Sequence, residues 1–249
     1  MARRRHNNRK RRRGRLSFLY KLLTFVGICA VIVGAVTFFF RLEEVEVTGS
    51  THYTQEEIVT ASGLEPGDNL YLMNKYAVAE RIRRLPYVET VQIRRRLPAT
   101  ITVRVTETNH VAGIVQGGDL WLVSPNLRLL EKLPASLCDS YCLIRGVTLT
   151  EPAVGAAARI PEEGRAAPLQ QLLTALSSKD MTDETNVIDL TDETAVTLEY
   201  AQRFRVLVPA RTDFAYKMEY LKAVVGKLEN NEKGTIDLQT DGKASFIPD

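Results

Sequence analysis

The feature that most constrains this chain is an uncharged run of 19 residues, Leu22 to Phe40, close to its N-terminus. A helix rises about 1.5 Å per residue, so this run covers about 28 Å, close to the thickness of the hydrocarbon core of a bilayer. A cleaved signal peptide usually has an apolar region of about 7–15 residues that ends at small residues. Here the nearest such pattern, Val33–Ala35, lies inside the run. The sequence therefore predicts an uncleaved membrane-spanning helix over residues 18–40.

The residues before the helix, 1–17, form a basic tail. Its cationic side chains are Arg3, Arg4, Arg5, Arg9, Lys10, Arg11, Arg12, Arg13 and Arg15. Basic residues beside the first spanning helix hold that end in the cytoplasm, and no second apolar run follows. We therefore expect a single-pass type II protein whose N-terminus is cytoplasmic and whose remaining residues, after Arg41, are extracytoplasmic. Nucleic-acid or headgroup binding is an alternative reading of the tail, but the topology signal alone accounts for it.

The net charge divides at the same place. The chain has 33 Lys and Arg against 30 Asp and Glu, which gives +3. Residues 1–41 hold eleven of the basic side chains and none of the acidic ones, so residues 42–249 carry 22 against 30, a net charge of −8. An acidic outer region is poorly suited to phosphate backbones, which disfavours nucleic acid as its partner.

Residues 42–108 predict a strand, two helices and two further strands. Val45–Val47 alternates as a short strand. Thr54 and Glu57 have the spacing of a capping box, and Gly63 is well placed to end that helix.

A second helix is predicted to begin after Asn74 and to stop at Pro86, with Val78, Ile82 and Leu85 on one face. Alternating apolar residues over 91–97 and 101–105 predict the two closing strands.

Residues 109–249 predict mainly strands. Short apolar runs separated by turn residues lie at 111–115, 120–123, 127–130 and 143–147, and residues 151–168 favour a loop. Helices are predicted over 168–178 and 213–228, and hairpins over 197–208 and 234–247, the last across Asp241–Gly242. The predicted fold class is α+β, with a mainly antiparallel β-rich domain.

The order of the elements in residues 42–108 resembles a POTRA module. Arg95–Glu107 is similar to the end of that module in the FtsQ/DivIB family of bacterial cell-division proteins. Segments similar to the second, β-rich domain of that family follow in order at 110–112, 120–123, 143–147, 216–224 and 235–238. The chain departs from the family at Ser124 and Leu127, where the family tends to have an acidic residue and a glycine.

The resemblance implies four parts: the tail 1–17, the membrane helix 18–40, a POTRA-type module 42–108 and a β-rich partner-binding domain 109–249. It implies a non-enzymatic scaffold of the inner or cytoplasmic membrane at the division septum. The scaffold would bind FtsL and FtsB/DivIC outside the membrane and couple septal peptidoglycan synthesis to division. The alternative is a POTRA-bearing chaperone or receptor of a secretion pathway that binds client β segments. Outer-membrane assembly proteins usually carry several POTRA units before a barrel, whereas this sequence shows one unit and an anchor.

Catalytic signatures are missing from the sequence. It has no Ser-x-x-Lys, Gly-x-Ser-x-Gly, His-Glu-x-x-His or phosphate-loop motif, so we predict no catalytic residue, metal, cofactor or small-molecule substrate. A membrane-tethered wall enzyme would need such a set. The Thr-Asp-Glu-Thr repeats at 182–185 and 191–194 lack the spacing of a calcium loop and are predicted to be solvated strand ends.

Cys138 and Cys142 lie in the predicted outer region, where a disulfide could form. In an extended strand their Cα atoms would be about 13 Å apart, too far for a bridge. A disulfide therefore requires a turn between them, and the sequence leaves this open.

A protein without catalytic groups works by binding, and the terminal hairpin is the predicted site because an edge strand offers unpaired backbone groups to a partner strand. Phe246 could supply an aromatic anchor. Core packing is the favoured role for the side chains of Ile236 and Leu238. The resemblance places the binding of FtsB/DivIC, and with it FtsL, on this hairpin. The predicted binding residues are Thr235, Ile236, Asp237, Leu238, Gln239, Thr240, Ser245 and Phe246.

Overall fold

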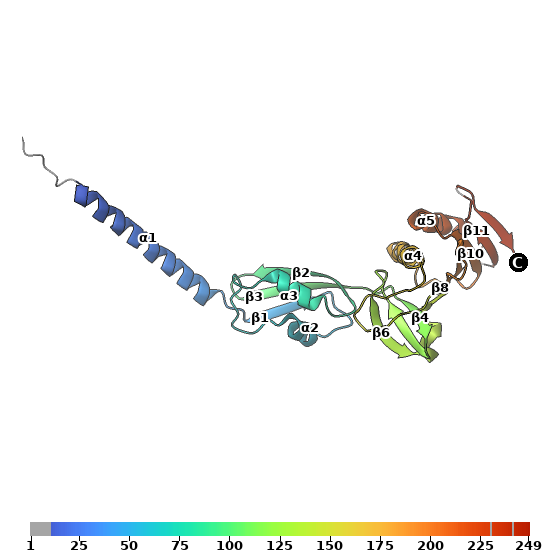
Figure 1. Ribbon diagram of the computed structural model, residues 1–249, viewed down its shortest axis with the longest axis horizontal. Helices are drawn as coiled ribbons and strands as arrows, with labels where there is room; N and C mark the ends of the chain where they lie inside the picture. Colours follow the sequence, from blue (N-terminus) through green and yellow to red (C-terminus); the bar gives the residue numbers. More distant parts are fainter. Residues whose placement is uncertain (1–10, 230, 241) are drawn as a thin grey trace, which may run out of the picture. The chain divides into compact units, whose positions relative to one another are not determined.

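The computed structural model of the protein describes residues 11–229, 231–240 and 242–249 and contains two compact units. One unit comprises the chain up to Ile82 together with Val91–Val105, and the other comprises Arg83–Thr90 and Thr106–Asp249. Figure 1 labels many of the elements of both units. The predicted α+β class is confirmed, and the four-part division of the chain stays a prediction.

The N-terminal helix α1 spans Arg11–Phe39. Within it, Phe18–Phe39 has a mean hydropathy of 2.5 and no buried residue, and it is the one helix of the described residues that is long and apolar enough to cross a membrane. Of the predicted topology residues, Arg11, Arg12, Arg13 and Arg15 lie in the first turns of α1. Arg3, Arg4, Arg5, Arg9 and Lys10 lie outside the described residues.

The first unit combines a three-stranded sheet with two short helices. Its elements are β1 (Glu44–Thr48), α2 (Gln55–Ser62), α3 (Lys75–Ile82), β2 (Val88–Arg96) and β3 (Thr100–Glu107). The strand order is β1-β3-β2, and β1 runs parallel to β3. The predicted order of strand, two helices and two strands is thus confirmed.

Local sequence signals set the ends of α2. The amide of Glu57 donates to Thr54 Oγ1 at 3.3 Å, and the amide of Thr54 donates to Glu57 Oε2 at 2.8 Å, so the predicted capping box is present. Gly63 ends the helix with a φ of 63°, a conformation that glycine adopts without steric cost.

The start of α3 also matches its prediction, because Asn74 Oδ1 accepts hydrogen bonds from the amides of Tyr76 and Ala77. The helix ends at Ile82, however, and the predicted continuation to Leu85 was wrong. The cause is Pro86: its ring would clash with the carbonyl of residue 82 in a continued helix, and it disfavours helical backbone at the residue before it.

The second unit is built on one nine-stranded sheet with the order β12-β11-β10-β9-β8-β7-β4-β5-β6. The first part of its chain contains β4 (Ala112–Gln116), β5 (Asp119–Val123), β6 (Leu129–Pro134), the 3-10 helix η1 (Ala135–Ser140) and β7 (Cys142–Arg145). The second part contains α4 (Ala166–Ser178), β8 (Thr185–Asp189), β9 (Ala195–Tyr200), β10 (Phe204–Pro209), α5 (Phe214–Val225), β11 (Gly234–Asp237) and β12 (Ser245–Pro248).

The sheet is mixed. Five of its eight pairings are antiparallel, whereas β4–β7, β7–β8 and β10–β11 are parallel. Parallel neighbours need a crossover connection, and α4 supplies it between β7 and β8 while α5 supplies it between β10 and β11. The sequence predicted both helices but not the parallel pairings that they connect.

The core of this unit lies between the sheet and the two helices, which Figure 1 shows beside β8 and β10. The apolar face of α4 is buried, as predicted from its helical spacing. One continuous row of apolar side chains crosses six paired strands on this inner face. Its members are Ile144, Ile188, Leu198, Val206, Ile236 and Phe246.

The turn between β5 and β6 is held by a hydrogen bond, although the sequence departs from the family there. Ser124 Oγ accepts from the amide of Arg128 at 3.1 Å, as an acidic side chain could. Leu127 has a φ of 56°, in the left-handed region that favours glycine, and its side chain is nevertheless buried in the core.

Candidate functional site

The candidate site is the end of the large sheet formed by β11 and β12. β11 is an interior strand, because it pairs in parallel with β10 on one side and antiparallel with β12 on the other. The backbone of Thr235–Asp237 is therefore already paired on both sides. This corrects the prediction that Thr235, Ile236 and Asp237 offer a free strand edge: the edge strand is β12, which contains Ser245 and Phe246.

The predicted binding residues fall on different faces. Ile236 and Leu238 are fully buried, with exposed fractions of 0%, and pack in the core under the helices. Thr235 and Asp237 are half-buried, whereas Gln239 and Thr240 are exposed in the turn that follows β11. A partner seated on the edge can thus reach Ser245, Phe246 and the turn, but not the side chains of Ile236 and Leu238.

The backbone of β12 alternates between facing β11 and facing outward. The amide of Asp249 donates to the carbonyl of Lys233 at 3.1 Å, which fixes the phase of the alternation. Because successive residues point their N–H and C=O groups to opposite sides, Ser245 and Ile247 also face β11, and Phe246 and Pro248 face outward. Pro248 has no N–H, so Phe246 is the one residue of β12 that presents both a donor and an acceptor on the outer edge.

The side chain of Phe246 is held on the inner face. Its ring meets that of Phe204 edge-on, with centroids 6.2 Å apart and an interplanar angle of 77°. Gly234 lies in β11 directly opposite Phe204, and a Cβ at this position would collide with the backbone of Ile247 in β12. The neighbouring Ile247 points to the other face and is 59% exposed. Sequence reasoning missed Ile247, although it stands beside Phe246 in the predicted strand.

A buried lysine ties α5 to the end of β11. Lys217 is 1% exposed, and its Nζ donates to the carbonyl of Leu238 at 2.8 Å. Sequence reasoning missed this residue as well. It lies three residues after Phe214 and four before Leu221, both buried, so helical spacing places it on their face of α5.

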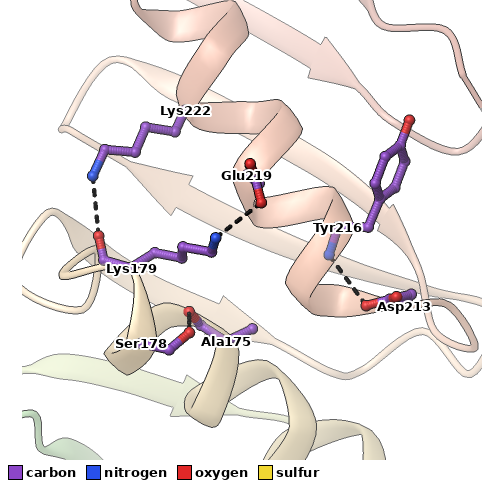
Figure 2. Close-up of polar contacts among 7 residues, drawn as sticks. All are labelled: Ala175, Ser178, Lys179, Asp213, Tyr216, Glu219 and Lys222. Carbon is purple, nitrogen blue, oxygen red and sulfur yellow. Dashed lines mark hydrogen bonds and ion pairs between the residues drawn. The ribbon is translucent and has the colours of Figure 1, made fainter.

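The two helices that cover the inner face are joined at their outer surface. Lys179, at the C-terminal end of α4, pairs with Glu219 of α5, as Figure 2 shows, and its Nζ donates to Glu219 Oε2 at 2.9 Å. Lys222 Nζ in turn donates to the carbonyl of Lys179 at 3.1 Å. The hydrogen bond and charge of Lys179 lower the pKa of Glu219. Asp213 caps α5 by accepting from the amide of Tyr216.

The face of the sheet opposite the helices is polar and carries an open groove of about 870 Å³. Oppositely charged residues stand directly across strands there: Arg145 beside Asp189, and Glu199 beside Arg205. Hydrogen bonds from Thr191, and then the charges of Arg145 and Arg205, lower the pKa of Asp189. A groove lined by both signs of charge carries no single preference for cations or anions.

Cys138 and Cys142 are free thiols in this structure. Cys138 lies in the 3-10 helix η1 and is half-buried, whereas Cys142 begins strand β7 and is buried in the core. Burial raises the pKa of the Cys142 thiol to about 12. The described residues contain no group of three or more His, Cys, Asp or Glu side chains that could hold a metal ion. Asp189 and Asp192 instead accept hydrogen bonds from the amides of Thr191 and Thr194 around the second acidic repeat.

Comparison with known proteins identifies the relatives of this chain. Residues 40–108 match the family described as "POTRA domain, FtsQ-type". The chain is 25% identical over 209 residues to the cell division protein DivIB of Clostridium acetobutylicum, an alignment that covers 84% of this chain and 83% of that protein. It is 30% identical over 122 residues to the cell division protein FtsQ of Geotalea daltonii, covering 49% of this chain and 43% of the relative.

A third relative is the FtsQ protein of Corynebacterium glutamicum, which is 36% identical over 88 residues, 33% of this chain and 40% of that protein. The alignments to the two FtsQ proteins thus span less than half of each relative. Among solved structures, the major extracytoplasmic domain of DivIB from Geobacillus stearothermophilus matches with 16% identity and a TM-score of 0.31. That match covers 51% of this chain and 98% of that one.

Proposed function

The chain is a relative of the bacterial cell-division proteins FtsQ and DivIB, and from this premise we propose that it is a membrane-anchored scaffold of the division machinery. In this proposal α1 spans the cytoplasmic membrane with the basic tail inside, and both folded units lie outside, at the septum. The scaffold binds FtsL and FtsB/DivIC and couples septal peptidoglycan synthesis to division without catalysing a reaction itself.

One observation carries the proposed binding site: β12 is an end strand of the nine-stranded sheet, so its outer side has no neighbouring strand among the described residues. An incoming strand gains main-chain hydrogen bonds at such an edge, and alternate side chains add selectivity. Phe246 presents the outward donor and acceptor, and Ile247 presents an exposed apolar side chain on the open face. We therefore place the partner strand against β12 rather than against β11.

Substitutions at Phe246 separate backbone pairing from side-chain contact. Phe246→Ala and Phe246→Pro both remove the ring, but only proline also removes the outward N–H. That N–H is not used in pairing with β11, so the hairpin keeps its own hydrogen bonds in both variants. We expect Phe246→Pro to abolish co-purification of FtsL and FtsB/DivIC from membranes and Phe246→Ala to reduce it.

Equal capture by the two variants would show that the backbone edge is not the template for a partner strand. Capture at the wild-type level by both would remove β12 from the binding site altogether. These single substitutions test the edge more specifically than deletion of residues 235–249 would. That deletion also removes the core side chains of Ile236 and Leu238 and so destabilises the unit.

A further inference from the structure

The end of the first unit that adjoins α1 carries an unusual group of exposed apolar side chains. Tyr71, Leu72, Tyr76 and Leu97 are 47%, 78%, 74% and 51% exposed, respectively. Three of them lie in the segment between α2 and α3 or in the first turn of α3, and Leu97 lies in the turn between β2 and β3. They are named here the juxtamembrane patch. Clustered apolar side chains of this kind mark an interaction surface.

Hydrogen bonds and a ring contact tie the first segment of the patch to the end of α1. The amide of Leu70 donates to the carbonyl of Phe40 at 2.9 Å, and Asn69 Nδ2 donates to the carbonyl of Val36 at 3.1 Å. The rings of Tyr71 and Phe40 meet edge-on with centroids 5.0 Å apart. Tyr71 therefore contacts Phe40, the first residue after α1.

The second segment of the patch lies at the same end. The amide of Glu43 donates to the carbonyl of Ala99 at 2.8 Å, which places the turn containing Leu97 beside the chain as it leaves α1. Leu42 is hydrogen-bonded to Asp68 on the other side. Residues 42 and 43, which lead from α1 into β1, thus lie between the segment that carries Tyr71 and Leu72 and the turn that carries Leu97.

Basic side chains accompany the aromatic ones. The Arg95 guanidinium lies 5.8 Å from the centroid of the Tyr71 ring, and its Nη2 donates to the carbonyl of Met73 at 3.1 Å. Lys75 Nζ lies 5.4 Å from the centroid of the Tyr76 ring. Aromatic rings beside cationic side chains are typical of the lipid headgroup layer. There the ring packs against the acyl chains and the cation binds phosphate.

The length of α1 sets the depth of the patch. The 22-residue span Phe18–Phe39 extends about 33 Å, which is enough to cross a hydrocarbon core of about 30 Å. Phe38 and Phe39 then lie at the outer boundary of the bilayer, and the segments that contact Phe40 lie immediately next to it.

We propose that the juxtamembrane patch inserts into the outer leaflet of the membrane that α1 crosses, so that the first folded unit rests on the lipid surface. This inference depends on the proposed membrane anchoring of α1. The bound surface is a lipid headgroup layer, with apolar contact from Leu72, Tyr76 and Leu97 and phosphate contact from Lys75 and Arg95.

Depth-dependent tryptophan quenching in reconstituted full-length protein tests this. The chain has a single tryptophan, Trp121, whose signal in the wild-type protein provides the baseline. Leu72→Trp and Leu97→Trp place a probe in the patch, and Glu56→Trp places one on the exposed face of α2 as a matched control. The vesicles contain phosphatidylcholine and phosphatidylglycerol with bromine at defined acyl positions, and vesicle flotation reports membrane insertion.

We expect the probes at 72 and 97 to be quenched at a depth of about 5–10 Å below the headgroups, the range of interfacial segments, and the probe at 56 to stay at the baseline. Adding Leu72→Asp and Tyr76→Asp to Leu97→Trp should return the probe at 97 to the baseline. Floating vesicles in which the probes at 72 and 56 behave alike would overturn the inference while leaving the anchor intact. Loss of flotation would overturn the anchor and the inference together.

Discussion

At the residue scale, the two outer cysteines differ most in their chemistry. Cys142 lies in the core and Cys138 is half-buried in η1, and burial raises the pKa of Cys142 to about 12. A raised pKa keeps the thiol protonated, and the thiolate is the nucleophile, so we expect Cys142 to be unreactive near neutral pH.

We therefore expect iodoacetamide at pH 8 to modify Cys138 and spare Cys142 in the folded protein, and to modify both after denaturation in urea. Peptide mass spectrometry after digestion measures both sites. Equal modification of the two cysteines in the folded protein would show that Cys142 is not buried, and a 138–142 disulfide would contradict the free thiols of this structure.

At the scale of single elements, Lys217 joins helix α5 to the end of strand β11 through the carbonyl of Leu238. Replacement by methionine keeps most of the side-chain volume and leaves that carbonyl without the donor. The unsatisfied group should lower the free energy of unfolding by about 1–3 kcal/mol. Chemical denaturation in detergent, followed by the fluorescence of Trp121, measures the loss.

Lys222→Met is the matched control on the same helix. Its Nζ also donates to a backbone carbonyl, that of Lys179, but at an exposed position. We expect a change within about 0.5 kcal/mol, as is usual for surface substitutions. The role assigned to Lys217 would be refuted by two variants of equal stability.

The elements also show what sequence can predict. Signals between neighbouring residues were read correctly: the capping box at Thr54, the glycine at 63 and the buried stripe of α4. The order of strands in a sheet depends instead on pairings between distant segments, and no local periodicity encodes it. For that reason the sequence identified the terminal hairpin but not that β11 is covered on both sides.

The burial of Lys217 was not predicted from the sequence for a different physical reason. A lysine in an apolar stripe usually predicts a solvated edge of the helix, because an ammonium group is costly to bury without a partner. Its partner here is the carbonyl of Leu238, 21 residues further along the chain. Only the folded arrangement brings the two groups together.

At the scale of the whole molecule, net charge divides between a basic N-terminal tail and an acidic remainder of the chain. Replacing the arginines at 3–5, 9 and 11–13 with glutamine removes most of the signal that holds the tail in the cytoplasm. We expect a mixture of orientations, measured by protease protection of the outer region in spheroplasts. The same number of substitutions at exposed arginines of the outer units is the control, and unchanged orientation in the tail variant would assign the cluster another role.

In the function proposed for the whole molecule, a partner strand pairs with the outer edge of β12. Residue-resolved amide hydrogen exchange, with and without FtsL and FtsB/DivIC, measures this most directly. In the free protein the amides of Ser245 and Ile247, which face β11, should be protected, and the amide of Phe246 should exchange fast. We expect the complex to protect the amide of Phe246 and to leave the exchange of the Ser245 and Ile247 amides little changed. A Phe246 amide that still exchanges fast in the assembled complex would contradict it.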